Sequence, residues 1–106
     1  MPPIAEFELR VLLAVMQSGV DAYAVRVHQE LEARTKRAVA IGAVYITLDR
    51  LVRKGWLASK LGEPSPERGG KAKRFYSVTA RGKVALRSEI RAMHRLWQGL
   101  DVVPEA

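Results

Sequence analysis

The chain has no cysteine among its 106 residues, which excludes disulfide bonds, cysteine-ligated zinc and thiol chemistry. It also lacks long apolar runs, because the longest, Val11 to Met16, is far below the ~20 residues of a membrane-spanning helix. The first residues carry neither the basic flank nor the cleavage site of a signal peptide, so we expect a cytoplasmic protein. No repeat or low-complexity linker divides the sequence, which predicts one small domain.

Acidic residues are few relative to basic ones. Eleven Asp and Glu face 18 Lys and Arg, which gives a net charge of +7 and a pI near 10.3. This balance favours an acidic polymer as partner, although a solvated basic surface has the same composition. The only histidines, His28 and His94, fall in different predicted helices, with no carboxylate or nucleophile at a suggestive spacing. Because a phosphate-binding glycine loop is also missing, we expect no enzyme and no metal or organic cofactor.

A helical period is clearest over residues 42–54. Apolar side chains recur there on one face, which we expect to pack inward: Val44, Leu48, Leu51 and Val52. The opposite face mixes small, hydroxyl, branched apolar and cationic side chains, as suits the floor of a DNA major groove. Its members, predicted to contact DNA, are Ala43, Ile46, Thr47, Arg50 and Lys54. Tyr45, beside the helix start, either offers its hydroxyl to a phosphate or packs in the core.

A β-hairpin is predicted to follow this helix. Gly55 is placed where a glycine ends a helix, and segments 56–61 and 74–78 have strand composition. The glycines and prolines of residues 62–70 are strong turn formers. Cations gather at the tip and on the second strand, at Arg68, Lys71, Lys73 and Arg74. Phosphate is their natural partner, so the hairpin, residues 57–78, is expected to act as a DNA-binding wing.

Two helices are predicted before the helix of residues 42–54. The first runs from Ala5 to Ser18 and ends at Gly19; the second, capped by Asp21, covers residues 22–35. Three helices followed by two strands predict a mainly α, α+β fold, a winged helix-turn-helix over residues 1–79. The short β-branched segment 39–41 is a candidate third strand of the hairpin.

A last helix is predicted from Ala80 to Leu100, capped by Thr79, within a C-terminal dimerisation segment that covers residues 80–106. Its apolar residues follow a heptad seam: Leu86, Ile90, Met93, Trp97 and Leu100. Such a helix is roughly 30 Å long, so its far end should project and need a partner, most simply a second copy of the chain. The first helix is apolar nearly all round. We infer that a second subunit also covers it, at Leu12 and Val15; the alternative is cover by the wing and last helix of the same chain.

Two stretches resemble the PadR family of bacterial winged-helix transcription regulators. Residues 41–57 are similar to the family pattern Gly-Thr-Leu-Tyr-Pro-x-Leu-x-Arg-Leu followed by a glycine turn. The matching residues are Gly42, Tyr45, Leu48, Arg50, Leu51 and Gly55, whereas Ala43, Val44 and Ile46 depart from the pattern. Residues 69–82 are similar to Gly-Gly-Arg-x-Arg-Lys-Tyr-Tyr-x-Leu-Thr-x-x-Gly. Here Lys71 and Lys73 replace arginines, which keeps the charge but loses bidentate geometry.

The resemblance implies a homodimeric, usually repressing regulator of the short type with one C-terminal helix, bound to a pseudo-palindromic operator. Some short members hold flat aromatic molecules between tryptophans at the dimer centre. Trp97 therefore either fills the dimer core, which we favour, or lines an effector site. The alternative for the whole chain is a winged helix used for protein–protein contact in a larger assembly.

Overall fold

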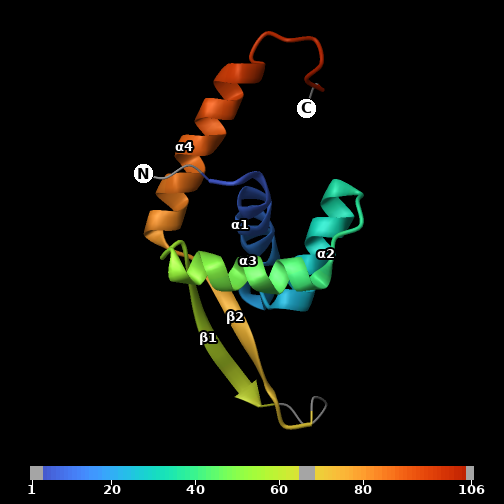
Figure 1. Ribbon diagram of the computed structural model, residues 1–106, viewed down its shortest axis with the longest axis vertical. Helices are drawn as coiled ribbons and strands as arrows, with labels where there is room; N and C mark the ends of the chain where they lie inside the picture. Colours follow the sequence, from blue (N-terminus) through green and yellow to red (C-terminus); the bar gives the residue numbers. More distant parts are fainter. Residues whose placement is uncertain (1–3, 65–68, 105–106) are drawn as a thin grey trace.

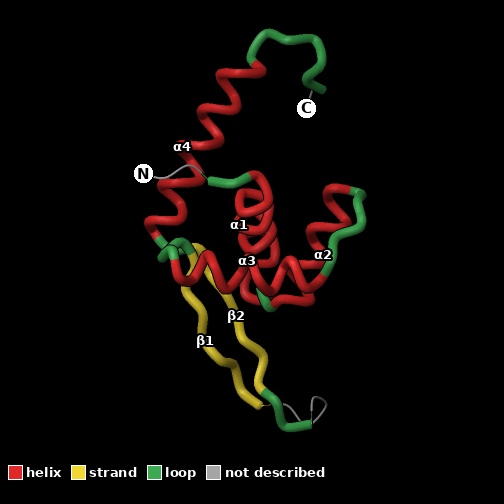
Figure 2. Tube along the Cα trace, viewed as in Figure 1, coloured by secondary structure: helices red, strands yellow, loops and turns green. Residues whose placement is uncertain are grey.

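The computed structural model describes residues 4–64 and 69–104 and has the expected winged-helix α+β fold (Figure 1). In chain order its elements are α1 (Glu6–Ser18), the 3₁₀ turn η1 (Gly19–Asp21), α2 (Ala24–Thr35), α3 (Ile41–Arg53), β1 (Leu57–Pro64), β2 (Ala72–Val78) and α4 (Ala80–Trp97). The two strands pair antiparallel, from Leu57 opposite Val78 to Pro64 opposite Ala72 (Figure 2). The predicted helix-helix-helix-strand-strand order, and the wing within it, are confirmed.

The molecule is elongated, with extents of 53 × 30 × 21 Å. In Figure 1 α3 lies across the body in front of α1, while the hairpin and α4 extend from it in opposite directions. The far half of α4 projects beyond the body, as its length predicts. The projecting end of α4 therefore does not cover α3 or the wing.

The core lies where α1, α2 and α3 meet the start of β1 and of α4. The largest fully buried side chains include Trp56, Leu12 and Leu48. Burying a leucine or valine stabilises the fold by about 1.5–3 kcal/mol. Leu12 and Val15, predicted at a subunit interface, are buried by the chain's own elements. Leu86 is buried in the same way, so these three residues are core residues and the sequence prediction was wrong for them.

Helix α2 begins two residues later than predicted, because the sheet uses the residues before it. Asp21 lies in the 3₁₀ turn and caps nothing, and Tyr23 occupies the N-cap position in an extended conformation. The N–H of Tyr76 donates to the carbonyl of Ala22 at 2.8 Å, and Tyr23 forms a β-bridge with Phe75. This short segment, rather than residues 39–41, extends the hairpin.

Residues 39–41 instead belong to the connection into α3. The N–H of Val39 donates to Glu32 at 2.9 Å, and its carbonyl lies 2.6 Å from Nε2 of His28, so α2 side chains hold this backbone. Ile41 is already the first residue of α3. The proposed third strand is therefore wrong.

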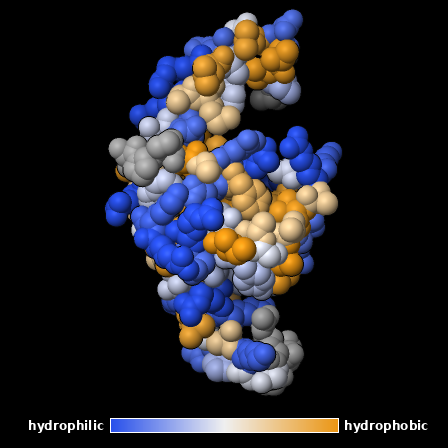
Figure 3. Space-filling view, in the orientation of Figure 1, coloured by the Kyte–Doolittle hydropathy of each residue, from blue (hydrophilic) through white to orange (hydrophobic). Residues whose placement is uncertain are grey.

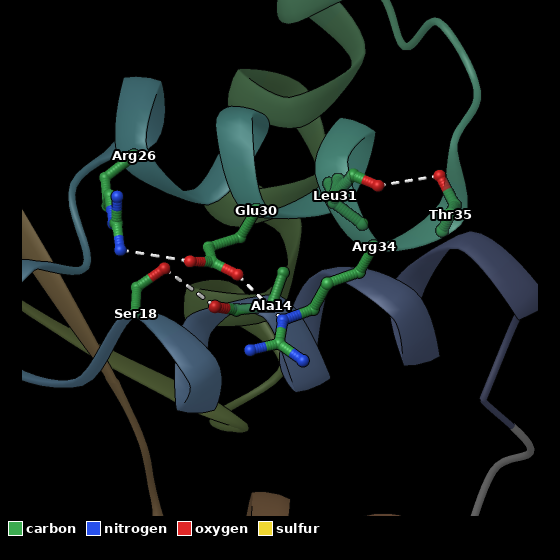
Figure 4. Close-up of polar contacts among 7 residues, drawn as sticks. All are labelled: Ala14, Ser18, Arg26, Glu30, Leu31, Arg34 and Thr35. Carbon is green, nitrogen blue, oxygen red and sulfur yellow. Dashed lines mark hydrogen bonds and ion pairs between the residues drawn. The ribbon is translucent and has the colours of Figure 1, made fainter.

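Helix α2 has charges that pair along the helix, on the side that lies beside α1 in Figure 4. Glu30 forms ion pairs with Arg26 at 3.0 Å and with Arg34 at 2.8 Å. The hydroxyl of Thr35 donates to the carbonyl of Leu31 at 2.6 Å. Each of these arginines has a carboxylate partner four residues away. The basic residues of α2 are thus largely neutralised within the chain.

Thr79 caps α4 as predicted and also ties it to the end of α3. Its hydroxyl accepts from the N–H of Gly82 at 3.0 Å and donates to the carbonyl of Gly55 at 2.7 Å. Gly82 packs so closely on the Trp56 backbone that a Cβ would lie 2.3 Å from its carbonyl oxygen. Helix α4 ends at Trp97, three residues before the predicted end.

Candidate nucleic-acid interface

Helix α3 has one buried and one exposed face. Val44, Thr47, Leu48 and Leu51 are buried. The exposed face consists of Gly42, Tyr45, Ile46, Asp49, Arg50 and Arg53. At about 100° per residue, this face lies roughly a quarter of a turn from the predicted one. Ile46, which is 62% exposed, and Arg50 belong to both faces.

This rotation changes the predicted exposure of Thr47 and Ala43, which were both expected to contact DNA. Thr47 is only 4% exposed and packs inside, whereas Val52, expected inside, is half-buried. Ala43 is half-buried in a hollow that Phe7 and Val39 also line. The prediction placed the hydroxyl of Thr47 outward and the side chain of Val52 inward. Because the methyl group of threonine tolerates burial, polarity alone gave the wrong rotation of α3 about its axis.

The exposed face of α3 adjoins the wing. A hollow of about 210 Å³ lies between them, lined by Tyr45 of α3 and by Lys73, Arg74 and Tyr76 of β2, together with the start of α2. Tyr45 is 51% exposed, so of its two predicted placements the structure shows the exposed one. In Figure 3 the surface over much of this region is hydrophilic.

Wing cations are held in defined positions. The Nζ of Lys73 lies 3.9 Å from the ring centroid of Tyr23, which in turn meets Phe75 edge-on at 5.8 Å. Such a cation–π contact contributes ~0.5–1 kcal/mol at an exposed site. Arg74 donates to the hydroxyl of Ser59 at 3.1 Å. Lys71 is exposed, and Arg68 lies outside the described residues.

Tyr76 lines the same hollow. Burial raises its pKa above the usual value; Arg74 opposes this, while Asp49 and Tyr45 add to it. A protonated phenol is a hydrogen-bond donor. The hollow therefore combines two cations with tyrosine hydroxyls, which is the chemistry of a phosphate contact.

Arg50 and Arg53 differ in their neighbours. Arg53 forms an ion pair with Asp49 four residues earlier. In the part of the chain that the structure describes, Arg50 has no carboxylate partner. Its guanidinium is the one on this face that is free to bind an acceptor outside the chain.

Lys54, predicted to contact DNA, is exposed but is paired within the chain. Its Nζ lies 2.7 Å from a carboxylate oxygen of Glu8, at the start of α1. Glu8 was not among the predicted site residues, although Glu8, Leu12 and Val15 are spaced i, i+4 and i+7 and so share the inner face of α1. That spacing was the available signal.

Residues 4–64 and 69–104 show neither a membrane-spanning helix nor a metal-binding cluster. None of the helices there is long and apolar enough to cross a bilayer. No three His, Asp or Glu side chains within the same ranges are grouped as metal ligands would be.

Comparison with known proteins identifies the family. The family description "Transcriptional regulator PadR-like family" matches residues 12–88. A PadR-like transcription factor from Bacteroides fragilis superposes with a TM-score of 0.74 at 20% identity, over 92% of this chain and 89% of that one. A PadR family regulator from Eggerthella lenta superposes with a TM-score of 0.68 at 26% identity, over 89% and 83%. No curated protein matches the sequence. The family match covers most of the chain, including α3 and the wing, and the chain therefore belongs to the PadR-like family of DNA-binding transcriptional regulators, which is not a family of enzymes.

Proposed function

We propose that the chain is a homodimeric repressor of the bacterial cytoplasm that binds a pseudo-palindromic operator. The observation that carries this proposal is the adjacency of the exposed face of α3 and the cationic face of the wing. Two such units, with recognition helices about 34–36 Å apart, would enter successive major grooves on one side of a duplex.

Within each unit, α3 reads bases and the wing binds backbone. The unpaired Arg50 is suited to guanine, and the exposed Ile46 to a thymine methyl group. Tyr45, Lys71, Lys73 and Arg74, with Arg68 at the tip, bind phosphates and set affinity. Thr47 and Ala43 leave this set because they are buried or half-buried.

Helix α4 supplies the dimer contact in this proposal. Beyond the buried start of α4, Ile90, Leu96 and Trp97 are exposed on the helix, and Leu100 is exposed just after it. Leu13 and Met16 of α1 are exposed too. Figure 3 shows apolar surface toward the upper end, over the far part of α4. A projecting helix with that many exposed apolar side chains is stabilised by burying them against a second copy.

Trp97 is assigned to the dimer core. It is 37% exposed and meets His94 edge-on at 6.0 Å. A small aromatic effector is the competing use of this residue. It has a parallel in BpsR of Bordetella bronchiseptica, whose DNA binding is regulated by 6-hydroxynicotinic acid and whose fold superposes at 16% identity with a TM-score of 0.66. Quenching of tryptophan fluorescence in the dimer by flat aromatic molecules would favour the effector, and no response would exclude it.

The proposal is tested by selecting bound duplexes from a random pool and titrating variants against the selected site. Arg50→Ala should weaken specific binding by roughly 1–3 kcal/mol, and Lys73→Ala should reduce the salt slope by about one unit on any duplex. Arg95→Ala on α4 is the matched control and should change neither. Unchanged operator affinity in Arg50→Ala would remove α3 from base recognition. A promoter carrying the site should be silenced by the wild-type chain, and an increase in transcription would contradict repression.

A further inference from the structure

Glu8 is unusual among the charged residues. It is the one ionisable residue in residues 4–64 and 69–104 that is buried, at 2% exposure. Its Oε1 accepts from the N–H of Ala5 at 3.1 Å, at the start of α1, and its Oε2 accepts from Nζ of Lys54 at 2.7 Å. Both carboxylate oxygens are thus engaged, one by its own helix and one by the end of α3.

This ion pair differs from the others in what it joins. The remaining pairs of the described residues, such as Arg10 with Glu6, link residues four apart on one helix. Glu8 and Lys54 are 46 residues apart and connect α1 to the residue that caps α3. The Lys54 ammonium also lies 5.1 Å from the centroid of the buried Trp56 ring. It is therefore held between an anion and an aromatic face.

The energetics favour a fixed arrangement. An exposed ion pair contributes little to stability and is easily exchanged. The Glu8 carboxylate is buried although the Lys54 side chain is partly exposed, so losing its partner would leave an uncompensated buried charge. Lys54 therefore cannot move to a DNA phosphate without leaving Glu8 unpaired.

We infer that Glu8 is a positioning residue, which withholds Lys54 from the DNA backbone and fixes the end of α3. The inference rests on the proposed DNA-binding role of α3. A lysine next to a DNA-binding face would otherwise add a phosphate contact, and such contacts strengthen binding to every sequence equally. Pairing that lysine internally keeps the sequence-independent part of the affinity low.

Glu8→Gln isolates this effect, because glutamine keeps the size and the oxygen that accepts from Ala5 but removes the charge. Binding is measured at several salt concentrations, on the selected operator and on an unrelated duplex of equal length. We expect the salt slope to become steeper by about one unit and binding to strengthen on both duplexes, with the ratio of the two affinities unchanged. Glu89→Gln on α4 removes the same charge elsewhere and should leave the slope unchanged.

The double variant Glu8→Gln/Lys54→Met identifies the cation responsible and avoids an unpaired buried carboxylate. Its slope should return to the wild-type value. A slope one unit shallower than wild type would mean that Lys54 contacts phosphate in the native chain, which overturns the inference, as does an unchanged slope in Glu8→Gln. Thermal unfolding of each variant separates these outcomes from loss of fold. A wild-type chain that binds no duplex would refute the proposed function itself, a result distinct from all of these.

Discussion

Helices α3 and α4 are both amphipathic, and they differ in what covers their apolar sides. The apolar side of α3 is buried within the chain, at Val44, Leu48 and Leu51, so its other face is free for a polar partner. In α4 only the first turns are buried, and apolar side chains stay exposed along the rest. The contrast is between two kinds of surface: α3 presents a polar face over a core that the chain itself completes, whereas α4 leaves an apolar side open to solvent, where we propose that a second subunit binds.

The largest effect should come from truncating matched leucines on the two helices. Leu48 of α3 is fully buried, whereas Leu96 of α4 is 79% exposed. Leu48→Ala should lower the free energy of unfolding by about 2–5 kcal/mol, because it removes buried contacts and leaves a cavity. Leu96→Ala should lower it far less in the monomer, and any further loss should depend on protein concentration. Chemical denaturation measures both, and equal losses would erase the distinction between the helices.

Exposed isoleucines offer the next comparison, since Ile90 lies on α4 and Ile46 on α3. Ile90→Glu should weaken dimerisation by roughly 2 kcal/mol or more, because a carboxylate would be buried without a partner. Ile46→Glu should leave the dimer intact and weaken DNA binding through repulsion from phosphate. Sedimentation and DNA titration separate the two effects. If Ile46→Glu broke the dimer and Ile90→Glu did not, α3 rather than α4 would be the dimer contact.

The smallest effect concerns Tyr76, where α3 meets the wing. Burial raises the pKa of this hydroxyl, so the folded state binds the proton more tightly than the unfolded chain. Stability is therefore unaffected below the ordinary tyrosine value of about 10 and falls as the pH rises above it. Tyr76→Phe should make the decline shallower, as followed by denaturation between pH 9 and 11. An identical decline in both proteins would show that the pKa of Tyr76 is the same in the folded and unfolded chain.

Much of the fold follows from local pattern. The end of α1 at Gly19, the cap at Thr79 and the hairpin of residues 57–78 were all predictable from residue type and spacing. These features depend on residues close together in the sequence. The start of α2 was not predictable in this way, because Tyr23 is drawn into a bridge with a strand some fifty residues later.

The site was predicted in part for the same reason. Cation density and helical period placed α3 and the wing correctly, but not the rotation of α3, which depends on what packs beneath it. Thr47 is buried because neighbouring elements cover that side of α3. Lys54 pairs with Glu8, which is distant in the sequence. The seam of α4 contained no sign that Leu86 belongs to the core.

We propose that the exposed face of α3 and the wing bind DNA, and that the side of α4 on which Val84 lies does not. Because the chain has no cysteine, single thiols can be introduced by Ile46→Cys on α3 and by Val84→Cys on α4, both at exposed positions. The rate of thiol alkylation is then measured with and without operator duplex. The account predicts that DNA protects the thiol at position 46 and leaves the thiol at position 84 reactive; protection at 84 with none at 46 would contradict it.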